Sequence, residues 1–368
     1  MPTTGASHRA RRARAAEAGR ALGIAALLIS PGPDLAYLTG YRIRPSERLT
    51  CLVLASDGSA RLVAPAFEAP RASTAAPDLD LAPWEETDNP FALVASLVRD
   101  RGTIAVADQM WAAFLIQLQE VLRGRSVLPA SAITRALRIR KDDAEIAALR
   151  AVASAADRAY VRILERPFAG RAERDIALEL AALLRDEGHD EVGFTIVASG
   201  PNGASPHHDS GERVISEGDV VVLDFGGTKD AYCSDLTRTV FVGPRPDRDA
   251  LRVHDLVRRA QEAAYAAACE GARAADVDAA ARRLIADAGF GAHFIHRTGH
   301  GIGLEGHEHP YLVAGNTEPL APGMAFSLEP GVYLSGRFGV RIEDIAVIGR
   351  DGQAEPLNRA DHALATVR

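Results

Sequence analysis

The residues of this chain best suited to chemistry are four carboxylates and one imidazole in its second half. They are Asp224, Asp235, His300, Glu329 and Glu343. Oxygen-rich ligand sets of this kind suit hard divalent cations, and four negative charges are enough for two of them. Two metal ions that share a water are a known device for hydrolysis. The residue types therefore predict a dinuclear metallohydrolase.

The two aspartates lie in segments with the pattern of a β-hairpin. Residues 220–227 form a Val-rich run that ends in two glycines, and residues 233–243 form a second strand-like run after the polar turn 228–230. Opposed residues of a hairpin have a constant sum of positions, and Asp224 and Asp235 centre on that turn. We therefore expect them to be direct cross-strand partners, with Cβ atoms about 5 Å apart. A cation between them would offset the repulsion of their charges.

The two glutamates show the same symmetry. They lie in residues 325–334 and 338–348, and Glu329 and Glu343 centre on the turn between these runs. Pro330 cannot donate to a strand ladder, and a register shift of one residue is the alternative here. A single strand carboxylate usually faces solvent, but two symmetric pairs beside apolar residues indicate a site.

A glycine-rich segment, residues 294–310, supplies the imidazole. His300 stands in its Gly-His-Gly core, where glycines permit tight turns and a close backbone approach. His307 follows and is suited to proton transfer or oxyanion stabilisation. We expect His293 and His309 to be ordinary surface or packing residues.

A second loop, residues 199–212, precedes the first aspartate strand and is rich in turn-forming residues. It carries His207 and His208. A loop of this kind can place a histidine over the metals, and we expect one of the two to do so and the other to be only its neighbour.

Length and pattern predict two domains. A chain of 368 residues exceeds one ordinary core. Residues 1–135 alternate short apolar runs with helical stretches and predict an α/β domain. Residues 136–368 alternate long Ala-rich helices with the hairpins and predict an α+β domain with antiparallel strands.

Composition argues against several other classes of protein. The net charge of −7 gives no support for nucleic-acid binding, and no apolar run reaches the length of a membrane span. The basic cluster at residues 8–14 precedes an apolar run without a cleavage signature, so we do not expect a signal peptide. The three cysteines form no spaced framework, which favours a reducing, cytoplasmic location.

Five stretches in order resemble the pita-bread metallopeptidases, most closely the branch of Xaa-Pro dipeptidase (prolidase) and Xaa-Pro aminopeptidase. They are VVLDFGG, CSDLTRT, HRTGHGIGLEGHEHP, SLEPGVY and GVRIEDI. The resemblance covers nearly the whole chain. It implies a creatinase-like α/β domain (1–135), a pita-bread catalytic domain (136–368) and a homodimer.

The resemblance also implies roles for individual residues. Two divalent ions, Mn²⁺ first and Co²⁺ or Zn²⁺ as alternatives, would be bound by Asp224, Asp235, His300, Glu329 and Glu343. Asp235 and Glu343 would reach both ions. Glu329 would also carry protons. The substrate and the tetrahedral intermediate would be held by His207 and His307, with Arg341 supporting the site.

Substrate contacts are less well defined by the sequence. An apolar pocket for the proline ring has three aromatic candidates, Tyr232, Tyr311 and Phe338. Many prolidases are expected to bind the free carboxylate of the dipeptide with an Arg shortly after the HExP stretch, but residues 301–336 contain no Lys or Arg. We expect the carboxylate to be bound instead by Arg42, Arg44 or Arg48 of the N-terminal domain.

Three functions remain open at this point. The favoured one is an Xaa-Pro dipeptidase that acts on small peptides with proline in the second position. An Xaa-Pro aminopeptidase acting on longer peptides would need no carboxylate clamp. A non-catalytic binding protein, or a metal-free hydrolase of creatine-like substrates, should have lost metal ligands, and all five are present.

Overall fold

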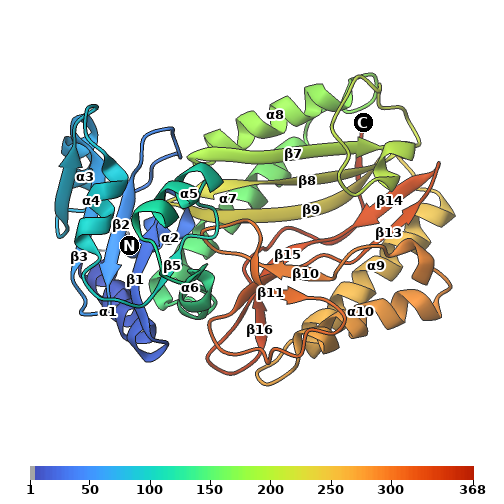
Figure 1. Ribbon diagram of the computed structural model, residues 1–368. Helices are drawn as coiled ribbons and strands as arrows, with labels where there is room; N and C mark the ends of the chain where they lie inside the picture. Colours follow the sequence, from blue (N-terminus) through green and yellow to red (C-terminus); the bar gives the residue numbers. More distant parts are fainter. Residues whose placement is uncertain (1–4) are drawn as a thin grey trace. The chain divides into compact units, whose positions relative to one another are not determined.

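The computed structural model describes residues 5–368 (Figure 1). The chain divides into two compact units, one ending at Arg138 and the other running from Ile139 to Arg368. Each unit has its own sheets and helices.

The first unit is built on a six-stranded mixed sheet of strand order β4-β3-β2-β1-β5-β6. The pairs β1–β5, β5–β6 and β3–β4 are parallel, whereas β1–β2 and β2–β3 are antiparallel. This is the predicted α/β class. The strands are β1 (Ile24–Ile29), β2 (Cys51–Ala55), β3 (Ala60–Pro65), β4 (Asp80–Trp84), β5 (Thr103–Val106) and β6 (Val127–Pro129), and the helices are α1 (Gly5–Ala21), α2 (Pro33–Thr39), α3 (Ala69–Ala75), α4 (Pro90–Leu97), α5 (Ala112–Val121) and α6 (Ser131–Arg138).

The second unit begins with two helices and a four-stranded sheet of order β17-β9-β8-β7, antiparallel except for the pair β17–β9. Helices α7 and α8 cover one face of this sheet (Figure 1), and buried apolar residues of the helices and the sheet form one core. The elements are α7 (Asp143–Ile163), α8 (Glu173–Asp186), β7 (Glu191–Ser199), β8 (Val220–Lys229), β9 (Tyr232–Val242) and β17 (Ala365–Val367).

The rest of this unit is a five-stranded sheet of order β11-β10-β12-β15-β16, a two-stranded ribbon β13–β14 and two helices. Apolar residues of both helices pack with this sheet and ribbon into a second core. The elements are α9 (Arg248–Ala267), α10 (Ala274–Asp287), β10 (Gly299–Gly301), β11 (Glu308–Leu312), β12 (Ala325–Leu328), β13 (Gly331–Leu334), β14 (Phe338–Arg341), β15 (Asp344–Ile348) and β16 (Ala354–Pro356). Helices packed on largely antiparallel sheets are the predicted α+β class.

The hairpin β8–β9 has a different register from the predicted one. Asp224 pairs with Thr237, and Asp235 pairs with Gly226, so the two aspartates are offset by two residues and are not direct partners. The turn is Asp230–Ala231, two residues that both have positive φ, and it lies one residue later than the predicted centre. Because side chains alternate with a period of two, both aspartates still point to the same face.

The second hairpin follows the predicted register. Leu328 pairs with Asp344 in one short ladder, and Gly331 pairs with Arg341 in the next, so the sum of positions is the same on both sides of the break. Glu329 and Glu343 occupy the matching positions within that break. Pro330 interrupts the ladder without shifting it.

No helix among residues 5–368 has both the length and the apolar composition that a membrane crossing requires.

Candidate metal centre

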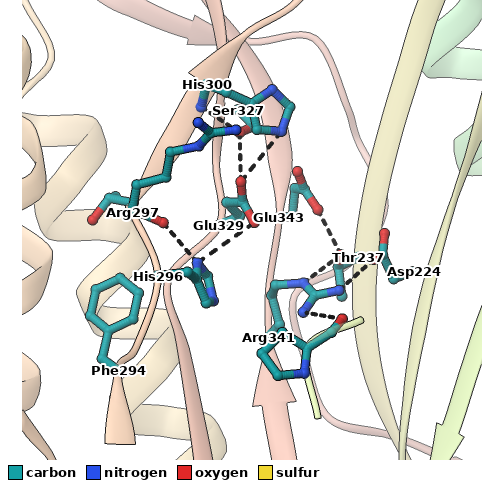
Figure 2. A network of polar contacts seen from close by, with 12 residues as sticks. Asp224, Thr237, Phe294, His296, Arg297, His300, Ser327, Glu329, Arg341 and Glu343 are labelled. Atoms are coloured by element: carbon teal, nitrogen blue, oxygen red, sulfur yellow. Dashed lines mark hydrogen bonds and ion pairs between the residues drawn. The ribbon is translucent and has the colours of Figure 1, made fainter. Parts of the chain in front are cut away.

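The five predicted ligands come from five separate strands or strand ends of the second unit, and their side chains converge. The ligand atoms of three of them, Asp224, Asp235 and Glu343, lie within 4.8 Å of one another. The same holds for His300, Glu329 and Glu343. Four of the five residues are labelled in Figure 2, where they point toward a common centre. Glu343 belongs to both groups, as expected of a ligand that reaches two ions.

Burial makes this arrangement electrostatically costly on its own. Burial, and then the neighbouring carboxylates, raise the pKa of both Asp235 and Glu343 well above the usual range. Burial also raises the pKa of Glu329 to about 7, and burial followed by His307 lowers the pKa of His300 to about 3. The carboxyl groups of Asp235, Glu329 and Glu343 keep their ionised, metal-binding forms only if positive charge is supplied. The imidazole of His300 is already neutral, which is the form that binds a metal.

Two further features fit a cation. Oδ1 of Asp224 is buried and has no hydrogen-bond partner among the described residues. An unsatisfied buried carboxylate oxygen is rare in proteins and calls for a ligand. The donor set of carboxylates plus one imidazole is the type that divalent Mn²⁺ or Zn²⁺ accepts. The residues present therefore fit the divalent metal ions that the sequence predicts.

Arg341 supports two of the ligands, one directly and one through Thr237. Its Nη2 contacts Asp224, and its Nε donates to Oγ1 of Thr237 at 3.1 Å (Figure 2). Thr237 in turn donates to Oε2 of Glu343 at 2.6 Å. The guanidinium and the hydroxyl thus fix the carboxylates of Asp224 and Glu343.

A cavity of about 480 Å³ opens over these ligands. The predicted catalytic residues His207, His307, Glu329 and Arg341 all line it. The ring of His307 lies with its centroid 3.9 Å from that of His300, and its ligand atoms group with those of Asp235. His208 does not line the cavity but contacts Glu173, so His207 is the histidine of the pair that faces the centre.

Sequence reasoning missed five residues that line the cavity. One is Pro206, the neighbour of the predicted His207. Two are His296 and Arg297, which the HRTGH stretch carries just before His300. The other two are Phe194 and Ile196 of β7, where Ile196 pairs with Asp224 across the sheet. Their two-residue spacing on a strand next to the aspartate strand was a signal that could have found them.

Two of the aromatic candidates lie elsewhere, which corrects their predicted role. Tyr232 is buried in a core beside α7, and its hydroxyl donates to Oε1 of Glu145 at 2.9 Å. Phe338 is buried in the core under α9 and α10. Both are packing residues because strand alternation turns them into apolar layers. Tyr311 does not line the cavity either, but its ring lies under the guanidinium of Arg297 at 4.4 Å.

The three N-terminal arginines belong to the first unit. Arg48 donates to Oε1 of Glu86 at 2.7 Å and contacts Glu47, while the carbonyl of Arg42 accepts from Arg71. A role of Arg42, Arg44 or Arg48 in substrate binding stays a prediction.

Both parts of the chain match known protein families. Residues 147–350 match the profile of metallopeptidase family M24, and residues 11–140 match that of the creatinase/prolidase N-terminal domain. The chain is 46% identical to the probable dipeptidase PepE of Mycobacterium tuberculosis, over 97% of this chain and 96% of that protein. It is 34% identical to the Xaa-Pro dipeptidase of Lactobacillus helveticus, over 88% of this chain and 90% of that protein. The crystal structure of dipeptidase PepE from Mycobacterium ulcerans matches with a TM-score of 0.92 at 43% identity and covers 100% of both chains.

Proposed function

Because this chain belongs to metallopeptidase family M24, as its sequence motifs predicted, we propose that it hydrolyses Xaa-Pro dipeptides with two divalent metal ions, Mn²⁺ first among the candidates. The observation that carries the proposal is the convergence of five ligand-type side chains in one cavity, with Oδ1 of Asp224 left unpaired among the described residues. The relatives named dipeptidase and Xaa-Pro dipeptidase span most of the chain and support this substrate class.

The residues divide into ligands and substrate-facing groups. When bound, the divalent ions supply an activated water and polarise the scissile carbonyl. The residues that would hold them are Asp224, Asp235, His300, Glu329 and Glu343. His207 and His307 line the same cavity and can donate to the oxygen that becomes negative in the tetrahedral intermediate. Arg341 keeps the carboxylate of Asp224 in place.

The leaving nitrogen of an Xaa-Pro bond must gain a proton, because proline leaves as an amine and not as an amide anion. Glu329 is our candidate carrier of that proton, because it borders the cavity. Its Oε1 accepts a long hydrogen bond from Ser327, at 3.2 Å, and lies 3.4 Å from Nε2 of His300. Phe194 and Ile196 supply the apolar wall of the cavity and replace Tyr232 and Phe338 as our candidates for contact with the proline ring.

The position of Arg297 supports a dipeptide, rather than a longer peptide, as the substrate. Arg297 lines the cavity, its guanidinium lies over the ring of Tyr311, and it forms no ion pair with an acid of the described chain. The other cavity arginine, Arg341, is already paired with Asp224. We therefore add Arg297 to Arg42, Arg44 and Arg48 as a candidate to bind the free carboxylate of the substrate.

The clamp can be tested by kinetics with matched substrates. Arg297→Ala should raise KM for Ala-Pro by about 10- to 100-fold, the worth of one charged hydrogen bond. The same variant should leave Ala-Pro-amide, which lacks the carboxylate, nearly unchanged. An equal loss on both substrates would remove Arg297 as the clamp, and Arg42→Ala, Arg44→Ala and Arg48→Ala would then be compared in the same assay.

The function itself is tested with protein stripped of metal and resupplied with Mn²⁺. We expect Ala-Pro to be cleaved only after metal is restored, and faster than Ala-Pro-Ala. Preference for the tripeptide would instead make the protein an Xaa-Pro aminopeptidase. Absence of cleavage of either peptide, with metal bound, would favour a binding protein. Parallel resupply with Co²⁺ and Zn²⁺ ranks the metals.

We also propose a cytoplasmic homodimer. Light scattering of the purified chain gives the oligomeric state directly, and a monomer at working concentration would contradict this expectation.

A further inference from the structure

One buried carboxylate outside the cavity is left unexplained by the chemistry above. Glu173 is the first residue of α8, and its relative exposure is 0%. A carboxylate in the first turn of a helix interacts favourably with the helix dipole. That gain is too small to explain complete burial of a charge, which requires hydrogen bonds to nearly all of its lone pairs.

The carboxylate of Glu173 receives those bonds from a single stretch of chain. Oε1 accepts from the backbone N–H of Ser199 at 2.7 Å and from its hydroxyl at 2.6 Å. The side-chain amide of Asn202 donates to both oxygens, at 3.0 and 3.1 Å. Oε2 also accepts from Nε2 of His208 at 2.8 Å and from the N–H of Gly211 at 3.4 Å. Glu173 is thus bonded to both ends of the loop 200–211.

The middle of this loop carries cavity residues. Pro206 and His207 lie between the two attachment points, and both line the candidate metal centre. The carbonyl of Pro206 accepts a long bond from Nη1 of Arg341, at 3.5 Å. Gly203 packs directly on Gly339 of β14, and a Cβ added to Gly339 would clash with the carbonyl oxygen of Gly203. The loop is therefore fixed at its ends by Glu173 and in its middle by β14.

The protonation state of Glu173 suits this task. Burial alone would raise the pKa of Glu173, but the hydrogen bonds from Ser199, then from His208 and Asn202, outweigh burial and hold the pKa below its usual range. The group is therefore an anion at neutral pH. An anion accepts from every one of its partners, including Nε2 of His208, which must then carry the proton.

We propose that Glu173 is a positioning residue for the proposed peptidase reaction: it holds the loop 200–211 so that His207 faces the metal centre. The inference rests on the proposed function for the role of His207, but the attachment of the loop does not depend on it. His208 is one of the points of attachment, which accounts for the second histidine of the Ser-Pro-His-His stretch.

The main test is Glu173→Gln, which keeps the shape of the side chain and removes its charge. We expect kcat/KM for Ala-Pro to fall by about 10- to 100-fold, since displacing a catalytic group by about 1 Å can cost about 100-fold. Metal content and the affinity for Mn²⁺ should remain those of the wild type. The matched control is Glu179→Gln on the same helix, which loses only surface ion pairs to Arg166 and Arg171 and should behave as the wild type.

A double-mutant cycle separates positioning from general structural support. If Glu173 acts through His207, Glu173→Gln should cost little further activity in a His207→Ala background. If the two losses multiply in full, the residues act independently and the proposal is wrong. If Glu173→Gln does not fold, Asn202→Ala and His208→Ala can be used instead, because each removes a single hydrogen-bonded attachment of the loop. Wild-type kinetics in both of these variants would also overturn the proposal.

Hydrogen exchange tests the attachment without any substrate. Amides of residues 200–211 should exchange faster in Glu173→Gln than in the wild type, while those of β8 and β9 stay unchanged. Unchanged exchange in the loop would refute the inference even if activity fell. Conversely, faster loop exchange in a protein that cleaves no Xaa-Pro peptide would leave the attachment standing and reject only the proposed function.

Discussion

At the residue scale, the candidate centre depends on side chains that touch the ligands and do not bind metal themselves. Thr237 is the clearest case, since its relative exposure is 0% and its hydroxyl has two functions at once. It donates to Oε2 of Glu343 and accepts from Nε of Arg341. Such outer contacts orient metal ligands and commonly change metal affinity by 10- to 100-fold.

We therefore expect Thr237→Val to weaken Mn²⁺ binding by about 10-fold or more. Valine has nearly the same shape, so the cost to the fold comes from the two lost hydrogen bonds to charged groups, each of which contributes about 1.5 to 3 kcal/mol. Calorimetric titration of the metal-free variant with Mn²⁺ measures the affinity. Thr228→Val on the same hairpin is the control, because Thr228 is opposite Cys233 near the turn and away from the ligands. Equal affinities in the two variants would show that the hydroxyl has no part in metal binding.

At the element scale, the sequence predicted the strands that carry the ligands better than the way they pair. The turn after β8 was placed too early because Lys229 and Asp230 have a turn-like composition. The chain instead turns at Asp230 and Ala231, which have φ of 51° and 75°. Two consecutive residues with positive φ make the hairpin turn that matches strand twist, and Gly or Asn normally marks it. Ala231 gives no such signal in the sequence.

The second hairpin was predictable because Gly336, with φ of 72°, marks its turn at the centre of symmetry. Its break at Pro330 follows equally from the sequence. By contrast, the cavity walls from β7 and the attachment of His208 to Glu173 join segments that lie far apart in sequence. Local patterns do not show which segments become neighbours. This explains why Tyr232 and Phe338 were placed in the site and why Phe194 and Ile196, despite their two-residue spacing on one strand, were not.

The strained turn provides a stability test. Ala231→Gly should stabilise the protein by up to about 1 kcal/mol, because glycine adopts positive φ without the penalty that a Cβ brings. Ala147→Gly, on an exposed position of α7, should instead destabilise it by about 1 kcal/mol. Both tryptophans, Trp84 and Trp111, lie in the first unit. The measurement should therefore be urea unfolding followed by circular dichroism, and a destabilised Ala231→Gly would contradict the strain argument.

At the scale of the whole molecule, buried neutral histidines make stability depend on pH. His254 of α9 is 6% exposed, and burial, followed by the charge of Arg258, lowers its pKa to about 4. Arg238 and His362 lower it further, and only Asp255 opposes them. In the unfolded chain the same imidazole titrates near its ordinary value of about 6.5.

The sign of the effect follows from the protons bound by each state. Above pH 6.5 His254 is neutral in both states and has no effect on the pH dependence. As the pH falls from about 6.5 to about 4, the unfolded state binds a proton that the folded state refuses, so unfolding becomes easier by up to about 3 kcal/mol. His254→Gln removes this titration. The measurement is the free energy of unfolding in urea of the variant and of the wild type, each at pH 7 and at pH 4.5. Between these two pH values, the free energy of unfolding should fall by less in the variant than in the wild type. Both proteins retain the carboxylates of the metal centre, so the titration of these acids cancels in the comparison. An equal fall in the free energy of unfolding in the two proteins would mean that His254 is already protonated in the folded state.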